Sequence, residues 1–301
     1  MKIKMLTKKI CMNPQSIWCS LGNHHLLNWI PDEYYLKLIY KARTGQKLNL
    51  INPQGYNEKL QWIKLYDRRP EYTIMVDKYT VRGYVEKKIG DEYLIPLLGV
   101  WDNPEEIEVD KLPEQFVLKC THDSGSIQIC RDKKNFDISS AKKTLKNRIK
   151  KGTYWATREW PYKNVKARVI AEKYMEDESQ KELKDYKVLC FNGQPRLIQL
   201  HRGRYSEHTQ DFYDTKWNKT NITQGLPLSS EIISKPECFA EMLELSSVLS
   251  QGIPHVRVDW YCISGKLYFG EMTFFDGSGF LLYDDPEIER KVGEWIHLPS
   301  R

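Results

Sequence analysis

The segment 256–275 carries acidic and basic side chains in a pattern that a metal-binding β-hairpin would need. Residues two apart along a strand share a face, so Arg257 and Asp259 project to the same side of the first strand. Glu271 takes the corresponding place on the second strand. Two facing carboxylates repel unless a cation lies between them, and oxygen ligands of this kind suit Mg²⁺. The pattern predicts that Asp259 and Glu271 hold a metal ion and that Arg257 stabilises a transferring phosphoryl group or an oxyanion.

The register of this hairpin depends on the length of its turn. A three-residue turn at 264–266 places Asp259 opposite Glu271, whereas a two-residue turn places the two carboxylates on opposite faces. We expect the three-residue turn. The competing interpretation is a surface hairpin with an Arg–Glu ion pair.

A second candidate site follows the apolar strand expected at 116–120. Lys119, near its end, can contact phosphates as a point charge. The small residues Ser124, Gly125 and Ser126 let backbone N–H groups approach phosphate oxygens. This is not a Walker A motif, because Lys precedes Gly and no helix follows. A hairpin turn with a solvated Lys is the alternative.

Two further strands carry weaker candidates. Glu172, followed by Lys173 and Tyr174, stands where a strand end with free backbone groups could read an adenine edge. Asp185 and Lys187 share one face of another strand. Ordinary strand ends have the same appearance, so a structural role is the alternative for both pairs.

The elements that must position these residues change in type along the chain. The first 112 residues are predicted to be mainly helical, with helices from Pro31, at 57–67 and at 75–88, and then a strand at 94–100. Lys78 and Arg82 fall on one face of the third helix, where a solvated basic face is the alternative. Strands are expected at 116–120, 127–130, 169–175, 185–191, 196–200, 256–263 and 267–275, helices at 141–151 and 237–251, and a long loop at 205–230. Asn192-Gly193 is a strong hairpin signal.

Composition limits the class of protein. The 301 residues are 41% hydrophobic and 12% aromatic, which suits a globular chain with two domains or lobes and not a disordered one. A formal net charge of +6 suits an anionic partner such as ATP or an acidic sugar. No zinc-finger spacing or RNA-recognition signature supports nucleic-acid binding.

Cysteine and histidine spacing points away from zinc and disulfides. The seven Cys residues include no C-x-x-C pair, so we expect buried reduced thiols and no disulfide framework. The His residues show no ligand spacing. No run of about 18 apolar residues and no signal-peptide core are present, so a cytoplasmic protein without a membrane span is expected.

In their order along the chain, these segments resemble the ATP-grasp superfamily. Within it they are most similar to the teichuronopeptide-biosynthesis (TupA-like) ATP-grasp family of bacterial capsule and cell-surface polysaccharide gene clusters. The segments that carry the resemblance span about residues 50–298. They are Tyr56–Trp62, Asp77-Lys78-Tyr79 with Arg82, Phe116–Lys119 with His122 and Ser124-Gly125, Glu172-Lys173-Tyr174, Asp185-Tyr186-Lys187 with Phe191-Asn192-Gly193, Arg257-Val258-Asp259, and Phe269–Thr273 with Gly277-Ser278-Gly279.

The resemblance implies an α+β fold, in which two lobes with antiparallel sheets clamp ATP behind a short helical N-terminal region. The boundaries expected from it are 1–112 for the helical region, 113–175 for the first lobe and 176–301 for the second, which holds the metal. Lys78, Lys119 and the loop 124–126 would bind the ATP phosphates. Glu172, Lys173 and Tyr174 would bind adenine, and Asp185 the ribose. Many superfamily members carry Asn two residues after the metal-binding Glu, where this chain has Thr273.

The reaction implied is carboxylate–amine ligation that uses ATP and Mg²⁺, with Arg257 and Lys187 as catalytic residues. The family context suggests a uronic acid of a surface polysaccharide or its precursor as the acid, and an amino acid or amino alcohol as the amine. The substrate-binding candidates are Arg202, Arg204, Thr273, Ser278 and Gly279. A solvated loop is the alternative for the two arginines.

Other functions remain open at the level of sequence. One alternative is a glycosyltransferase, which would release a nucleoside diphosphate from a sugar donor, although the segment Asp211-Phe212-Tyr213-Asp214 could be mistaken for its metal-binding acidic motif. A phosphotransferase on the same scaffold would need no amine. A basic binding module without catalysis would tolerate loss of Asp259.

Overall fold

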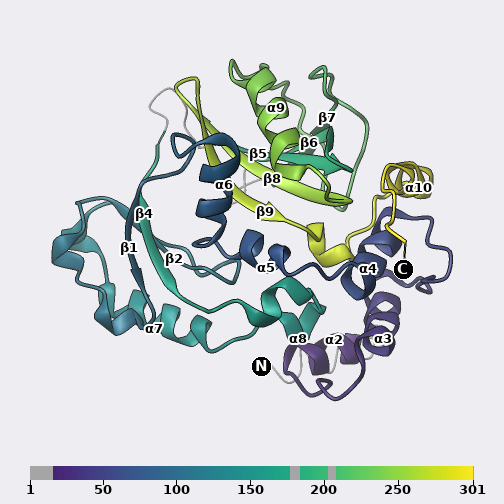
Figure 1. Cartoon of the computed structure of the whole chain (residues 1–301), viewed down its shortest axis with the longest axis horizontal. Coiled ribbons are helices and arrows are strands. Elements are labelled where there is room, and N and C mark those ends of the chain that lie inside the picture. Colours follow the sequence, from purple (N-terminus) through teal and green to yellow (C-terminus); the bar gives the residue numbers. More distant parts are fainter. Residues whose placement is uncertain (1–15, 177–183, 203–207, 301) are drawn as a thin grey trace.

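The computed structural model describes residues 16–176, 184–202 and 208–300. It begins with helices, as expected (Figure 1). They are α2 (Ser16–Asn23), α3 (Asp32–Thr44), α4 (Tyr56–Tyr66), α5 (Glu71–Val76) and α6 (Val81–Ile89). Tyr35, Leu36, Ile39 and Tyr40 bury one face of α3 at helical spacing, which explains its position in the core.

Two of these helices differ from the sequence-based prediction. The helix expected at 75–88 is interrupted at 77–80, where Asp77 accepts a hydrogen bond from the backbone N–H of Tyr79 at 2.8 Å. Lys78 therefore lies in a turn and not on the helix of Arg82. The helix expected to be capped by Asn57 begins at Tyr56, and the backbone N–H of Asn57 donates to Glu289 at 2.7 Å.

A four-stranded antiparallel sheet follows, with the order β1-β4-β2-β3. Its strands are β1 (Leu97–Trp101), β2 (Phe116–Cys120), β3 (Gln128–Cys130) and β4 (Val169–Lys173). Helix α7 (Ile138–Ile149) packs its buried Leu145 against this sheet. The short elements around it are η1 (Pro104–Glu106), η2 (Val109–Lys111), η3 (Lys133–Asn135), α8 (Tyr154–Thr157) and η4 (Trp160–Asn164). The sheet has a small hydrophobic core of its own.

A five-stranded antiparallel sheet holds most of the second half, with the order β7-β6-β5-β8-β9. Its strands are β5 (Asp185–Phe191), β6 (Gln194–Arg202), β7 (Thr209–Tyr213), β8 (His255–Ile263) and β9 (Lys266–Thr273). β7 lies within the segment expected to be a loop at 205–230. The turn between β5 and β6 has positive φ at Asn192 and Gly193, which confirms the predicted hairpin. The chain ends with η5 (Asp276–Gly279) and α10 (Pro286–Glu294).

The two faces of the five-stranded sheet have different roles. Helix α9 (Phe239–Ser250) covers one face, where the indole N–H of the fully buried Trp260 donates to Ser246 Oγ at 2.8 Å. Val256 and Val258 alternate with Arg257 and Asp259 along β8, so the charged side chains project from the opposite face. The N-terminal helices share one large core with this sheet.

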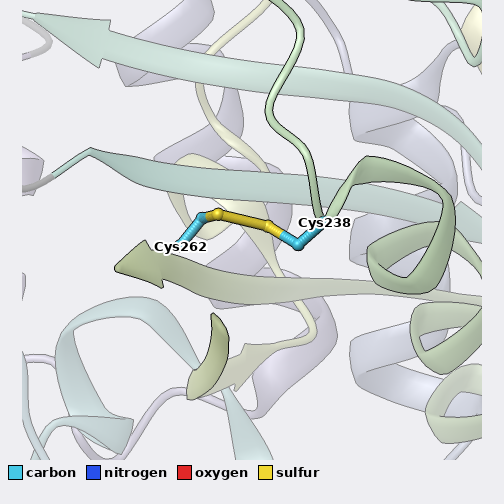
Figure 2. Close-up of a disulfide and its surroundings, with 2 residues drawn as sticks. All are labelled: Cys238 and Cys262. Atoms are coloured by element: carbon cyan, nitrogen blue, oxygen red, sulfur yellow. A yellow bond between two sulfur atoms is a disulfide. The ribbon is translucent and has the colours of Figure 1, made fainter. Parts of the chain in front are cut away.

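A disulfide joins Cys238, at the start of α9, to Cys262 on β8 (Figure 2). The expectation that all seven cysteines are reduced thiols is therefore wrong for this pair. The two residues are 24 positions apart, and only the packing of α9 on β8 brings them together. The described thiols that remain free are Cys19, Cys120, Cys130 and Cys190. No helix of the described residues has the length and apolar character that a membrane span needs.

Candidate functional site

The hairpin of β8 and β9 brings the two predicted metal ligands together. Asp259 pairs with Glu271 and Arg257 with Thr273, so the predicted juxtaposition of the two carboxylates is confirmed. The predicted three-residue turn is wrong. Ile263 pairs with Lys266, and Ser264 and Gly265 form a two-residue turn in which both have positive φ.

A bulge reconciles the short turn with the pairing of the carboxylates. Trp260 pairs with Phe269 and Asp259 with Glu271, which leaves Gly270 as the extra residue on β9. A Cβ atom at Gly270 would lie 3.0 Å from the backbone oxygen of Asp259. The backbone N–H of Phe269 also donates to Tyr93 O at 2.7 Å, which ties the bulged edge of the sheet to the preceding chain. Without this extra residue the short turn would place Glu271 on the core face.

Arg257 is the centre of the charged network on this face. Its guanidinium donates two hydrogen bonds to Asp259, at 2.7 and 2.8 Å, and one to Thr273 Oγ1 at 3.2 Å. It also forms an ion pair with Asp276 and lies 3.6 Å from Glu271 Oε1. Such a forked contact fixes the planar guanidinium in one orientation. Arg257 is thus held beside the two facing carboxylates, as its predicted role requires.

Lys187 extends the network to the neighbouring strand. It is the cross-strand partner of Asp259 on β5, and its ammonium contacts the carboxylates of Asp259 and Asp185, the latter at 2.7 Å. Asp185 and Lys187 share one face, as the strand periodicity predicted. The buried Asp259 therefore has two cationic partners.

Lys78 joins the two sheets. Its ammonium lies 3.0 Å from Glu271 Oε2 on β9 and donates to the backbone oxygen of Asp123 at 3.0 Å, in the loop that follows β2. Its backbone N–H donates to Thr121 O at 3.0 Å. Burial opposes charge on both side chains, but the pair with Glu271 outweighs it and raises the pKa of Lys78. Lys78, Lys187 and Arg257 together hold the pKa of Glu271 well below its usual range, so both partners carry full charge near neutral pH.

Lys119 and Glu172 form a second charged pair on the four-stranded sheet. Their charged atoms are 2.6 Å apart, and Arg82 on α6 approaches the other oxygen of Glu172 at 3.7 Å. Both side chains of the pair are mostly buried. Glu172, the predicted adenine contact, is therefore positioned by two cations.

The loop 121–126 has an anchored base and an exposed tip. Ser126 is buried, accepts from the backbone N–H of Cys120 at 2.8 Å and donates to Asp123 Oδ1 at 2.5 Å. Ser124 and Gly125 are exposed, and Gly125 has a φ of +96° that favours glycine. Of the three predicted phosphate contacts, Ser124 and Gly125 are exposed to solvent, whereas Ser126 is buried and holds the loop in its conformation.

The remaining nucleotide candidates lie at the end of β4. The side chain of Lys173 is exposed, but its backbone N–H donates to Pro96 O at 3.0 Å, so the prediction that this N–H is free is wrong. The hydroxyl of Tyr174 accepts from Arg131 Nε at 3.1 Å, and the guanidinium lies 5.7 Å from the ring centroid. An aromatic side chain with an adjacent guanidinium is a suitable surface for a planar base.

The substrate candidates are distributed over two places. Thr273 donates to Glu271 Oε1 at 3.4 Å and so lies beside the carboxylates. The backbone oxygen of Ser278 accepts from Lys64 at 2.7 Å, and that of Gly279 accepts from Gln61 on the same helix, α4. Arg202 instead pairs with Glu231 on a different part of the sheet. Arg204 lies outside the described residues.

Sequence reasoning did not identify Asp276, Asp123 or Lys64. Asp276 is buried and pairs with Arg257 from 19 residues away. Asp123 supplies the backbone oxygen for Lys78, and Lys64 is fully buried between Ser278 O and Thr157 O. Each contact depends on tertiary packing. A signal existed only for Asp276, which follows the strand that carries Glu271 and precedes Gly277.

The acidic motif of the glycosyltransferase alternative has structural partners. Asp211 is buried, lies 2.8 Å from the ammonium of Lys219 and accepts from the backbone N–H of Ser229 at 3.0 Å. Asp214 accepts from the backbone N–H groups of Lys216 and Asn218, both at 2.8 Å, and so closes a turn.

The donor set on the sheet face can be compared with the needs of Mg²⁺. Within the described ranges, no three or more His, Cys, Asp or Glu side chains converge as a metal site. Asp259 and Glu271 offer two facing carboxylates, and Mg²⁺ commonly takes one or two carboxylates with phosphate oxygens and water. The residues present therefore fit a magnesium ion that arrives with a polyphosphate.

Comparisons with known proteins give the following matches. The solved structures include D-alanine–D-alanine ligase from Bacillus anthracis complexed with ATP (18% identity, TM-score 0.42, 67% of this chain and 55% of that chain). D-alanine–D-alanine ligase from Helicobacter pylori matches with 14% identity, a TM-score of 0.41, and 80% and 69% coverage. L-amino acid ligase from Bacillus licheniformis matches with 12% identity, a TM-score of 0.47, and 83% and 57% coverage. The chain thus spans little more than half the length of two of these structures.

The family comparison covers more of the chain. No curated protein sequence matches. The model of the TupA-like ATP-grasp family matches residues 58–297, which include every candidate residue of the site described above. The predicted fold, with two antiparallel sheets and helices before them, agrees with this match. The chain therefore belongs to the TupA-like ATP-grasp family.

Proposed function

We propose that this chain is an ATP-dependent carboxylate–amine ligase that uses Mg²⁺. The observation that carries the proposal is the pairing of Asp259 with Glu271 across β8 and β9, with Arg257, Lys187 and Lys78 at the same carboxylates. The family match supports an ATP-grasp ligase in general terms.

Charge balance supports a polyphosphate ligand. Lys78 and Lys119 now neutralise Glu271 and Glu172, respectively. Phosphate oxygens could replace these carboxylates as partners of the two ammonium groups, which would leave Glu271 available to a cation. Asp259 and Glu271 would then hold Mg²⁺, which would neutralise charge on the phosphates and polarise their oxygens.

The proposed reaction has two steps that balance. A carboxylate oxygen of the acid bonds to the γ-phosphorus of ATP while the bond to the β–γ bridging oxygen breaks, so ADP leaves and an acyl phosphate remains. The amine nitrogen then bonds to the acyl carbon, phosphate leaves and the nitrogen loses a proton to solvent. The product is an amide.

The fixed residues serve these steps by position and charge. The guanidinium of Arg257, oriented by Asp259 and Asp276, would donate to the oxygen that becomes negative when the amine attacks. Lys187 keeps the Asp259 carboxylate in place from the adjacent strand. Most of the rate enhancement would come from positioning the two substrates.

We infer the substrate class from the resemblance to the teichuronopeptide-biosynthesis enzymes. The acid would be a uronic acid of a bacterial surface polysaccharide or its precursor, and the amine an amino acid or amino alcohol. Thr273, beside the carboxylates, and the loop that contains Ser278 and Gly279 are the substrate contacts proposed on this side of the sheet.

An assay of ADP release across uronates and amines tests the proposal. We expect ADP only when ATP, Mg²⁺, an acid and an amine are all present, and an amide product that contains both. Asp259→Asn should lower turnover by several orders of magnitude. Asp102→Asn is the matched control, because Asp102 forms an exposed ion pair with Lys166 at 2.5 Å.

Three outcomes would contradict the ligase. ADP release with the acid alone and a stable phosphorylated product would indicate a phosphotransferase. Release of a nucleoside diphosphate from a sugar donor would indicate a glycosyltransferase. A wild-type protein that binds ligand without turnover, and an Asp259→Asn variant that binds the ligand with the same affinity, would indicate a binding module.

A further inference from the structure

Helix α4 carries a row of buried polar side chains to which the ligase proposal assigns no function. Asn57, Gln61 and Lys64 are fully buried, and their spacing of four and three residues places them on one face of the helix. We call these three residues the polar stripe of α4. A polar group that is buried without a hydrogen-bond partner destabilises the fold, so the partners of the stripe indicate what it does.

All three side chains donate to backbone oxygens of one short segment, 278–281. The bonds run from Lys64 to Ser278 O at 2.7 Å, from Gln61 to Ser278 O at 3.3 Å and to Gly279 O, and from Asn57 to Leu281 O at 2.9 Å. The acceptors advance along the chain as the donors go back along α4. Figure 1 shows α4 beside this part of the chain, which leads from β9 to α10.

The conformation of the segment explains why it takes partners from another element. Gly277, Ser278 and Gly279 all have positive φ, at 53°, 55° and 62°. A serine keeps this conformation when the surrounding structure holds it there. The approach to α4 is also close, since a Cβ atom at Gly279 would lie 2.5 Å from Gln61 Nε2. The stripe therefore fixes the course of the chain at this point.

The chain that the stripe holds begins with Asp276, one of the partners of Arg257. The Asp276 carboxylate is buried and forms an ion pair with the guanidinium. Gly277 alone separates Asp276 from Ser278. A shift of Ser278 would therefore move Asp276, and Arg257 would keep Asp259 but lose the second carboxylate that orients it.

Lys64 makes the strongest case within the stripe. Its ammonium also donates to Thr157 O at 2.9 Å, and it lies 4.5 Å from the centroid of the Phe280 ring. No carboxylate in the described ranges forms an ion pair with it, and burial lowers the pKa of Lys64 from 10.5 to about 7. Methionine would fill similar space without a buried charge. The two hydrogen bonds to backbone oxygens are therefore what lysine contributes at this position.

We propose that the polar stripe of α4 consists of positioning residues, which set the orientation of Arg257 by holding the segment 276–281. The inference rests on the proposed ligase reaction, in which Arg257 donates to the oxygen that becomes negative. The three side chains are fully buried, touch no substrate and act through Asp276. Loss of one of them should lower kcat and leave ATP binding unchanged, because the predicted phosphate contacts lie on other segments.

Hydrogen exchange followed by mass spectrometry tests the hold on the segment and needs no substrate. Two backbone N–H groups are bonded within the segment: Ser278 donates to Phe275 O at 2.8 Å, and Phe280 to Gly277 O at 3.1 Å. Lys64→Met should raise the exchange rate in 276–281 by about tenfold or more, because the segment opens more often.

Lys59 provides a matched control on the same helix. Its ammonium also donates to a backbone oxygen, Ile296 O at 2.9 Å, which lies outside the segment. Lys59→Met should keep the wild-type exchange in 276–281 and the wild-type kcat. Gln61→Met is a second variant of the stripe in which Lys64 remains, and it should raise the exchange rate as Lys64→Met does. Thermal unfolding checks that each variant is folded.

Steady-state ADP release separates positioning from a general loss of structure. Lys64→Met should lower kcat by about tenfold to a hundredfold and keep KM for ATP within about twofold. The double variant Lys64→Met/Asp276→Asn should have the kcat of Asp276→Asn alone, because both changes act through one carboxylate. A wild-type kcat in Lys64→Met, or losses that multiply in the double variant, would overturn the proposal.

This inference and the proposed ligase reaction fail in different ways. A wild type that releases no ADP with any acid and amine would refute the ligase, and hydrogen exchange would still decide whether the stripe holds the segment. Equal exchange in 276–281 for wild type, Lys64→Met and Gln61→Met would refute the stripe, even with full ADP release.

Discussion

At the scale of single residues, the forked contact of Arg257 is the feature with the clearest chemical consequence. Lysine at this position keeps the charge but cannot hold Asp259 through two bonds and contact Asp276 at the same time. We expect Arg257→Lys to lower kcat by about a hundredfold. KM for ATP should change little, because Lys78 and Lys119 remain. Steady-state ADP release measures both constants.

A matched control exists for this substitution. Arg69 also bonds an aspartate, Asp67, at 2.8 Å, and it contacts none of the site residues described above. Arg69→Lys should keep the wild-type kcat. If Arg257→Lys had the kcat of Arg69→Lys, Arg257 would not be a catalytic residue.

His255 gives a prediction about acid stability. The side chain of His255 is buried. Its Nδ1 lies 2.9 Å from Cys190 O, and its Nε2 lies 2.9 Å from the hydroxyl of Tyr56. These partners suit a neutral imidazole, which donates one hydrogen bond and accepts one. Burial lowers its pKa from 6.5 to about 4. Between these values the unfolded chain binds the proton and the folded chain does not, so the free energy of unfolding falls as pH falls. The loss from this group is about 2 kcal/mol at about pH 5.

Urea unfolding at several pH values measures this effect. The comparison is with His255→Gln, which should show a shallower decline below about pH 6.5. Carboxylates contribute equally to both proteins, so the difference reports His255. His24→Gln, at an exposed position, should follow wild type. Equal pH slopes for wild type and His255→Gln would contradict the assignment.

The charged residues show what the sequence could predict at this scale. Strand periodicity placed Asp259 with Arg257 and Asp185 with Lys187, because residues two apart share a face in any strand. Asp276 and Asp123 were missed because their contacts join distant segments. Cys238 and Cys262 were missed for the same reason.

At the scale of elements, the β8–β9 hairpin has the predicted pairing of Asp259 with Glu271 although the predicted length of its turn is wrong. Ser264-Gly265 is a two-residue turn by its backbone, and a regular ladder from it would oppose Asp259 to Gly270. The bulge shifts the ladder by one residue. A single glycine in a strand is consistent with a bulge, but the alternation of side chains alone does not distinguish a bulge from a longer turn.

Gly270 can be tested directly. A methyl group there would lie 3.0 Å from the backbone oxygen and 3.4 Å from the carbonyl carbon of Asp259, so Asp259 must move. We expect Gly270→Ala to lower stability by about 1 kcal/mol and turnover by several-fold. Thermal unfolding and ADP release measure these changes.

Gly83 provides the control for the same substitution. It lies inside α6, where a Cβ atom meets nothing within 4 Å. Gly83→Ala should raise stability by about 0.5–1 kcal/mol, since alanine has the higher helix propensity, and leave turnover unchanged. A Gly270→Ala protein as stable and active as wild type would show that the bulge does not position Asp259.

The helix break at 77–80 is the other element that the sequence did not predict. The apolar spacing continues from α5 into α6, so a continuous helix was expected. The Asp77 carboxylate ends α5 by accepting from the backbone N–H of Tyr79. The backbone N–H of Lys78 then donates to Thr121 O and not to a helical carbonyl. A local competition between side-chain and helical hydrogen bonds decides the outcome.

At the scale of the whole molecule, a few polar contacts connect the two sheets. Helix α6 contacts the four-stranded sheet through Arg82, which approaches Glu172 on β4. It also contacts helix α9, which covers the five-stranded sheet, because the hydroxyl of Tyr84 donates to Leu249 O at 2.8 Å. Figure 1 shows α6 between the two sheets. Lys78 makes the second connection, from Asp123 O to Glu271. The family resemblance predicted two sheets around ATP, but the sequence did not reveal which residues join them.

Lys78 therefore gives a prediction about ligand binding. In wild type, ATP with Mg²⁺ at about 100 times its Kd should raise stability by about 2.7 kcal/mol and Tm by about 4 °C. ATP with a chelator should give a smaller shift, because Asp259 and Glu271 would lack the cation that attracts them to the phosphates. Lys78→Met should reduce the shift with Mg²⁺ strongly, because the phosphates lose one ammonium partner.

The ligand-free protein separates this effect from simple loss of an ion pair. Lys78 and Glu271 are only partly exposed, so Lys78→Met should also lower Tm without ligand, and the comparison must be of shifts and not of absolute values. Lys166→Met removes an exposed pair with Asp102 and should keep the full nucleotide shift. If Lys78→Met kept the full shift while Lys119→Met lost it, phosphate binding would belong to the four-stranded sheet alone. The contact between Lys78 and Glu271 would then serve to hold the two sheets together.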